Sequence, residues 1–140
     1  MTAPVLGLDL GSRRIGVAVS DPSGTIASPY QVLERSGDVA ADHRRLAELV
    51  AETGAGRVVV GLPLSLSGRA GPAAREAGAE VEAMAEVVGV PVEVHDERLT
   101  TVSAHRSMRA LGVRGEDRRR RADKVAAALM LQSWLDARRR

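Results

Sequence analysis

An acidic residue inside an apolar strand is the feature of this sequence that most restricts its fold. Residues 5–16 read VLGLDLGSRRIG, and alternation along a strand puts the three leucines on one face and Asp9, with Val5 and Gly7, on the other. A buried carboxylate needs a partner or a metal, whereas a carboxylate on an edge strand needs only water. Gly7 and Gly11 flank Asp9, and glycine in a strand often marks the close approach of a ligand or another backbone.

The rest of the sequence predicts a mixed α/β sheet flanked by helices. Three hairpin-linked antiparallel strands are expected first. After residue 38 the apolar residues follow the spacing of a helix, and from there helices are expected to alternate with strands. We expect one domain, residues 1–140, with any site outside the carboxyl ends of its parallel strands. The expected elements are strands 4–10, 15–20 and 25–33 (interrupted at Pro29), a helix from Val39 with Asp38 as N-cap and Gly54 as stop, strand 57–62, loop 63–71, helix 72–88, strand 90–96, helix 100–111, polar basic loop 112–121 and helix 122–137.

Three carboxylates are brought toward one edge of the sheet by this order of elements. Asp9 lies near the end of the first strand, Glu97 follows the last strand, and Asp123 opens the last helix. The residues at helical spacing from Asp123 are apolar, which turns its side chain toward the protein body. Asp123 as a simple N-cap is the alternative. Glu97 as a solvated partner of Arg98 is another, and the pattern does not choose between Asp96 and Glu97.

Converging carboxylates repel one another unless a cation lies between them. Hard oxygen ligands in a sequence without cysteine suit Mg²⁺ or Mn²⁺. Two such ions about 4 Å apart activate a water and stabilise a leaving oxygen in phosphodiester hydrolysis. The histidines lack metal-ligand spacing: His43 and His105 are expected on helix surfaces, and His95 is a candidate for orienting Glu97.

Positive charge is concentrated locally, although the net charge is only +2. The basic residues are almost all arginine, with runs at 118–121 and 138–140, and a planar guanidinium binds phosphate through two hydrogen bonds. A local patch of this kind serves nucleic-acid binding; a solvated loop and a frayed tail are the alternatives, and we expect residues 138–140 to be such a tail. Aromatic residues are limited to Tyr30 and Trp134, which argues against the base-stacking platforms of single-strand binders.

The sequence also indicates the cellular compartment of the protein. It contains no run of about 18 apolar residues and so predicts no membrane span. No basic start precedes the first apolar run, so no signal peptide is expected. The absence of cysteine excludes disulfides and thiolate metal sites, and it fits a cytoplasmic protein.

Four motifs in order resemble those of the YqgF/RuvX family, the Holliday-junction-resolvase-like proteins that are also described as pre-16S rRNA nucleases. The resemblance covers the chain almost end to end. Small departures are Arg13 where lysine is commoner, residues 65–67 in place of an Asn-Met-Asp-like loop, and Ala122 in place of a larger aliphatic residue. The motifs are DLGSRRIGVAVSD (residues 9–21), VGLPLSLSG (60–68), DERLTT (96–101) and DKVAAALMLQSWL (123–135).

The resemblance implies an RNase H-like fold with sheet order 3-2-1-4-5. It also implies that the catalytic, metal-binding carboxylates are Asp9, Glu97 and Asp123, and it selects Glu97 over Asp96. On this basis Asp9 is expected to bridge two metal ions, with the other two carboxylates each completing one side. The expected nucleic-acid contacts are Arg13, Arg14 and Arg98 as phosphate clamps, Ser12, Thr100 and Thr101 as hydrogen-bond donors at the rim, and Arg118, Arg119, Arg120 and Arg121 as a basic loop beside the site.

Several functions fit these residues. The preferred one is a metal-dependent nuclease that matures the 5′ end of pre-16S rRNA during ribosome biogenesis, acting as a monomer or weak homodimer. Resolution of four-way DNA junctions is the second, and a non-catalytic RNA-binding assembly factor the third. An ATP-binding module is a further alternative, because residues 9–12 also resemble the phosphate motif of the actin and sugar-kinase superfamily. Those proteins use two lobes, and this sequence has neither the second lobe nor a Walker motif.

Overall fold

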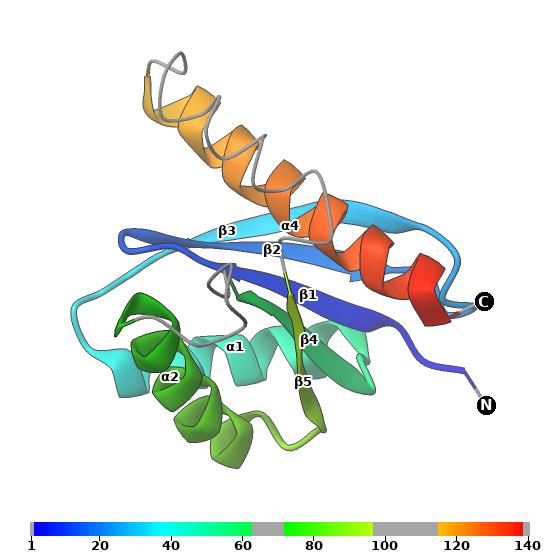
Figure 1. Cartoon of the computed structure of the whole chain (residues 1–140), viewed down its shortest axis with the longest axis horizontal. Coiled ribbons are helices and arrows are strands. Elements are labelled where there is room, and N and C mark those ends of the chain that lie inside the picture. The colour runs from blue at the N-terminus through cyan, green and yellow to red at the C-terminus, as the bar shows by residue number, and fades with distance from the viewer. Residues whose placement is uncertain (1, 63–71, 97–114, 139–140) are drawn as a thin grey trace.

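A five-stranded mixed sheet forms the centre of the molecule in the computed structural model, which describes residues 2–62, 72–96 and 115–138. The strand order is β3-β2-β1-β4-β5, as the family resemblance implies. The first three strands pair antiparallel, and β4 and β5 continue the sheet in parallel with β1. Helices α1 and α2 cover one face, and α4 crosses the other (Figure 1). The elements are β1 (Val5–Leu10), β2 (Arg14–Ser20), β3 (Ala27–Glu34), α1 (Val39–Thr53), β4 (Arg57–Leu62), α2 (Pro72–Val88), β5 (Val92–Asp96) and α4 (Glu116–Arg138).

The predicted capping of α1 is confirmed. The Asp38 side chain accepts a hydrogen bond from the backbone N–H of Ala41 at 3.3 Å, and Gly54 ends the helix in the left-handed conformation at φ 72°. Strand 57–62 and helix 72–88 are also confirmed with their predicted bounds. The predicted loop 63–71 and helix 100–111 lie outside the described residues.

The edge strand β3 differs from its prediction in two ways. It begins at Ala27 because the backbone N–H groups of Thr25 and Ile26 bind the Asp21 carboxylate in a turn. It is also not interrupted at Pro29, which pairs with Ala18 beside a register shift. A bulge on an edge strand accommodates proline, which cannot donate to the ladder. Strand β5 likewise begins later than predicted, at Val92.

The last helix corrects the prediction of a basic loop over residues 112–121. Helix α4 begins at Glu116, directly after Gly115 at φ 87°, so the four arginines at 118–121 lie on its first turns. Consecutive charges suggested a solvated loop, but a charged helical end that extends beyond the sheet is equally solvated. Figure 1 shows this end of α4 reaching past the edge at β3.

Two apolar clusters, one on each face, hold the sheet between the helices. The larger joins Leu6 and Leu8 of β1 to α1 and α2, and the smaller joins Ala18 and Val59 to the apolar face of α4. The predicted inward face of α4 is confirmed, since Ala126, Ala127 and Met130 are fully buried and Trp134 is 6% exposed. No helix within the described residues is long and apolar enough to span a membrane.

His43 is buried, in contrast to its predicted place on a helix surface. Only 2% of it is exposed, because it lies three residues before Leu46 and seven before Val50, on the inward stripe of α1. The periodic pattern was read from apolar residues alone, and so it did not include the polar His43.

Candidate functional site

Asp9 lies in the middle of the sheet, in a row of residues that share one face. In the strand register it stands opposite Gly16 of β2 and Gly61 of β4, and Gly61 stands opposite His95 of β5. Only 3% of Asp9 is exposed, so the predicted buried alternative is confirmed and the edge-strand alternative is wrong. The residues beside Asp9 on the two neighbouring strands are both glycines, so neither places a side chain next to the carboxylate.

Gly16 also brings the backbone of α4 onto the sheet beside Asp9. A Cβ atom at Gly16 would overlap the backbone oxygen of Asp123. A second close contact between the sheet and α4 lies at Gly7, two residues before Asp9 on β1. A Cβ atom there would come within 2.8 Å of the Leu131 Cβ. Because Gly16 is the register partner of Asp9, the start of α4 that carries Asp123 lies next to Asp9 on the same face.

Asp123 is held in this place by an ion pair with β2. Arg14 Nε donates to its Oδ2 at 2.7 Å, and the two side chains are 12% and 13% exposed. A second pair lies alongside, where Arg120 of α4 binds Glu34 of β3 at 2.6 Å. Arg14 and Glu34 are direct register partners, so the two ion pairs lie side by side. In one the strand supplies the arginine and in the other α4 supplies it, and together they hold the first turns of α4 against β2 and β3.

The predicted phosphate-binding arginines are not equivalent. Arg14 is occupied by Asp123, whereas Arg13 is exposed and forms no side-chain hydrogen bond or ion pair with the described residues. On α4, Arg120 is bound to Glu34, while the side chains of Arg118, Arg119 and Arg121 are exposed and have no such partner within the described part of the chain. The arginines available to an anion are therefore Arg13 and these three.

Four predicted site residues lie outside the described residues: Glu97, Arg98, Thr100 and Thr101. The strand that leads to them ends at Asp96, whose register partner is Leu62. Leu62 belongs to the core cluster on the α1 and α2 face, so Asp96 points away from the face that carries Asp9. The position of Asp96 therefore does not support it as the partner of Asp9, and Glu97 stays the predicted partner.

His95 of β5 lies on the same face of the sheet as Asp9 and contacts α4. Its Nε2 lies 3.1 Å from the Ser133 Oγ. Burial lowers the pKa of His95 below its ordinary value, despite the opposing charges of Asp96 and Glu93. The ring is thus more readily neutral than a solvated histidine. Its predicted role toward Glu97 stays a prediction.

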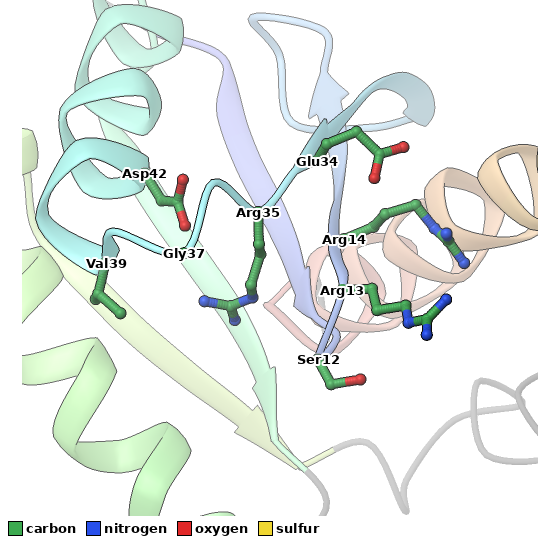
Figure 2. A pocket seen from close by; sticks show the side chains of 8 residues that line it. All are labelled: Ser12, Arg13, Arg14, Glu34, Arg35, Gly37, Val39 and Asp42. Carbon is green, nitrogen blue, oxygen red and sulfur yellow. The ribbon is translucent and has the colours of Figure 1, made fainter.

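A pocket of about 450 Å³ opens beside the turn that follows Asp9. On one side it is lined by Ser12 and Arg13 of the β1–β2 turn and by Arg14 at the start of β2, and on the other by Val39 and Asp42 of α1 (Figure 2). Arg35, which follows β3, points in between these two walls.

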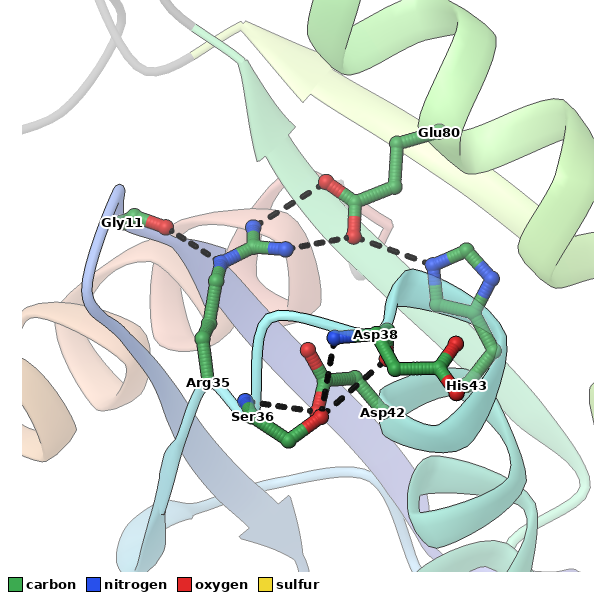
Figure 3. A network of polar contacts seen from close by, with 7 residues as sticks. All are labelled: Gly11, Arg35, Ser36, Asp38, Asp42, His43 and Glu80. Atoms are coloured by element: carbon green, nitrogen blue, oxygen red, sulfur yellow. Dashed lines mark hydrogen bonds and ion pairs between the residues drawn. The ribbon is translucent and has the colours of Figure 1, made fainter.

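A polar network that the sequence did not reveal fixes Arg35 in this place. Its Nε donates to the Gly11 carbonyl at 2.8 Å, and its two terminal nitrogens donate to the two Glu80 oxygens at 2.9 and 3.0 Å (Figure 3). His43 Nε2 lies 3.0 Å from the same carboxylate. Burial raises the pKa of Glu80, but its hydrogen bonds with Arg35 and His43 outweigh burial and hold the pKa below its ordinary value.

This network ties the turn after Asp9 to α1 and α2 on the far face of the sheet. No spacing in the sequence relates its members, because Arg35 follows β3 while His43 lies on α1 and Glu80 on α2, so only the fold brings them together. The sequence offered one indication of the network, namely that His43 lies at helical spacing from the apolar residues of α1.

The donor chemistry at Asp9 fits a divalent cation. Asp9 is buried and Asp123 is nearly so, and both present carboxylate oxygens on one face of the sheet. Within residues 2–62, 72–96 and 115–138 no group of three or more potential metal ligands is gathered. The third predicted ligand, Glu97, is outside those ranges.

Comparison with known proteins identifies close relatives. A family profile described as "RuvX: Holliday junction resolvase" matches residues 3–137. A protein of Mycobacterium sp. (strain KMS), named "Putative pre-16S rRNA nuclease", is 52% identical over 96% of this chain and 80% of its own length. A protein of Leifsonia xyli subsp. xyli (strain CTCB07) with the same name is 48% identical over 96% of this chain and 86% of its own length.

A solved structure shares the fold. RuvC of T. thermophilus in complex with a Holliday junction substrate superposes with a TM-score of 0.59 at 19% identity, covering 98% of this chain and 96% of that chain. The same RuvC in a second structure gives a TM-score of 0.57, again at 19% identity, over 97% and 96% of the two chains. The RNase H-like fold implied by the sequence motifs is thereby confirmed.

Proposed function

The chain belongs to the RuvX family, and we propose that it is a metal-dependent nuclease that hydrolyses phosphodiester bonds in the 5′-end maturation of pre-16S rRNA. Its membership is carried by a family profile over residues 3–137 and by relatives at about half identity. The observation on which the proposal depends most is the placement of Asp9 and Asp123 beside each other on one sheet face.

In this proposal Asp9, Glu97 and Asp123 hold Mg²⁺ or Mn²⁺, which when bound supplies an activated water and stabilises the leaving oxygen. Asp9 contributes a carboxylate that is fixed by the central strand, with a glycine beside it on each neighbouring strand. Asp123 is oriented by Arg14 Nε at 2.7 Å. Arg13, which has no side-chain partner among the described residues, binds a substrate phosphate on the turn that follows Asp9, and Ser12 adds a hydroxyl there.

The exposed arginines of α4 would bind the substrate strand. Arg118, Arg119 and Arg121 lie within about one and a half helical turns before Asp123, so they would track a backbone that leads toward the site. The contacts expected from Arg98, Thr100 and Thr101 belong to the same proposal. Phosphate contacts of this kind position a nucleic acid without reading its sequence.

RNA is the proposed substrate because the curated relatives carry the pre-16S rRNA name. We place the activity in the cytoplasm, with the protein acting as a monomer or weak homodimer. A four-way DNA junction is the second candidate substrate, and the description of the family profile favours it.

A two-substrate cleavage assay tests this function. Single-stranded RNA spanning a 16S rRNA 5′ end and a four-way DNA junction are each incubated with the protein and Mn²⁺ or Mg²⁺. We expect metal-dependent cleavage of the RNA that is lost in Asp9→Asn and kept in Glu48→Gln, a matched change of an exposed carboxylate on α1. Paired cuts in the junction alone would replace RNA with DNA as substrate. RNA binding without cleavage would contradict the nuclease and favour an assembly factor.

A further inference from the structure

The guanidinium of Arg35 is held flat and rigid by its neighbours. Three acceptors lie against its three nitrogens: the Gly11 carbonyl at 2.8 Å and the two Glu80 oxygens at 2.9 and 3.0 Å (Figure 3). These bonds lie in the plane of the group, since a guanidinium donates around its edge. Three of its five N–H groups are engaged in this way, and 17% of the side chain is exposed, so a further ligand can meet the flat face of the group.

The same side chain lines the pocket of about 450 Å³ between the β1–β2 turn and the start of α1 (Figure 2). That volume lies within the range of small-molecule sites. The pocket wall also carries two carboxylates, Glu34 and Asp42, and the Asp42 Oδ1 accepts from the Ser36 hydroxyl at 2.8 Å. The same walls carry Arg13, Arg14 and Arg35, and Glu34 is paired with Arg120 and Arg14 with Asp123. Because these charges are largely compensated, the pocket can take a neutral, planar group.

We propose that this pocket receives one unpaired nucleotide of the nucleic-acid substrate, with its base stacked on the Arg35 guanidinium and its phosphate bound by Arg13. The inference rests on the proposed function, which supplies the nucleic acid. Unpaired bases stack on arginine planes as they do on aromatic rings. A plane that is already fixed loses little conformational freedom when the base arrives.

Arg13 is placed to bind the phosphate of that nucleotide. It lies on the turn between the pocket and the start of α4, and its side chain points toward α4 rather than into the pocket (Figure 2). Within the described residues its guanidinium has no hydrogen-bond or ion-pair partner. A strand that leaves the pocket over this turn therefore meets a free cation on the side where Asp9 and Asp123 lie.

The composition supports stacking on arginine. The two aromatic residues are Tyr30, whose hydroxyl donates to Glu52, and Trp134, which is 6% exposed. Neither lines the pocket. The scarcity of aromatic side chains argued against a conventional base-stacking platform, and a rigid arginine fills that role without one.

Binding of a base-deleted RNA tests the inference without cleavage. In buffer containing EDTA, the affinity of a short single-stranded RNA is measured by fluorescence anisotropy, together with a series of RNAs in which one residue at a time is abasic. We expect one position at which loss of the base weakens binding about tenfold, the size of one stacked base. In Arg35→Lys, which keeps the charge and loses the plane, that penalty disappears while the affinity for the abasic RNA is unchanged.

The outcomes separate this inference from the proposed function. Binding that depends on salt but is equal for every abasic RNA would overturn the pocket and leave the nuclease proposal intact. A penalty that persists in Arg35→Lys would also overturn it, since the base would then stack elsewhere. Absence of any RNA binding would overturn both.

A second measurement needs no variant, in case Arg35→Lys does not fold. In the NMR spectrum of the wild-type protein, the Arg35 Nε–H signal is expected to move upfield when the intact RNA is added, because the stacked base shields it. The amide signals of Gly37 and Val39 on the pocket wall should move as well. The RNA that is abasic at the sensitive position should leave the Nε–H signal in place. An Arg35 signal that the intact RNA does not move would overturn the inference.

Discussion

Arg14 and Asp123, 109 residues apart in the sequence, form a nearly buried ion pair at 2.7 Å between the second strand and the last helix. The guanidinium occupies the side of the Asp123 carboxylate that faces β2, and Asp123 is one of the three proposed metal ligands. Arg14 therefore orients this ligand and at the same time lowers the negative potential that attracts a cation.

We predict that Arg14→Gln binds Mn²⁺ more tightly than the wild type, because a competing positive charge has been removed from Asp123. The expected gain is about tenfold in affinity, the equivalent of one charge-assisted hydrogen bond. Isothermal titration calorimetry measures it. Arg13→Gln changes the adjacent arginine, which has no ion-pair partner in the part of the chain that the structure describes, and should leave the Mn²⁺ affinity close to that of the wild type. Equal affinity in Arg14→Gln and wild type would show that Arg14 does not act on the metal site.

Gly16→Ala is expected to destabilise the protein by about 1–3 kcal/mol, the usual range for overpacking. The new methyl group would overlap the Asp123 backbone oxygen, so α4 must move away from β2. Gly78→Ala is the matched control: Gly78 lies in α2 with open space around it, and alanine there should stabilise by about 1 kcal/mol through helix propensity. Urea unfolding of the two variants should give changes of opposite sign.

Glu80→Gln should lower the free energy of unfolding at neutral pH by about 1–3 kcal/mol, because Arg35 and His43 lose a charged partner. The pKa of Glu80 in the folded protein lies below the ordinary value of 4.5. Its contribution to stability is therefore complete above that ordinary value and is lost as pH falls through the folded pKa. Urea unfolding across the acid range should show the wild type and variant converging at low pH. A constant difference at every pH would contradict the assignment.

The exposed arginines of α4 should account for part of the salt dependence of RNA binding. Replacing Arg118, Arg119 and Arg121 together by glutamine is predicted to flatten the slope of log affinity against log salt by about 2, since each single-strand phosphate contact contributes about 0.7. Anisotropy titrations over a salt series measure the slope. The control is Gln in place of Arg44 and Arg45, on α1 and so on the other side of the sheet. An unchanged slope in the α4 variant would exclude these arginines as phosphate contacts.

Local patterns were sufficient to predict most of the fold. Capping by Asp38, the stop at Gly54 and the alternation around Asp9 each depend on residues close together in the sequence, and the structure confirms them. The start of α4 was predicted wrongly because a run of arginines has no apolar period, although it adds turns to a helix already fixed by Ala126 and Met130. Sheet order came from the family motifs, since strand pairing at long range has no local signature.

The candidate site was predicted only where a residue carries its own chemical signal. Asp9 is a charge in an apolar strand, and Asp123 lies on the apolar stripe of a helix. The ion pair of Arg14 with Asp123 joins two elements whose approach depends on Gly16, so no spacing reveals it. The same holds for Arg35, Glu80 and His43, which three different elements bring together.

A double-variant cycle tests the central claim, that Asp9 and Asp123 belong to one metal-dependent catalytic site. Single-turnover rate constants for cleavage of the 16S 5′-end RNA in Mn²⁺ are measured for the wild type, Asp9→Asn, Asp123→Asn and the protein with both changes. Groups that act as a unit are strongly non-additive. We predict that each single variant loses nearly as much rate as the double variant. Losses that multiply independently, or a single variant that cleaves at the wild-type rate, would contradict the shared site.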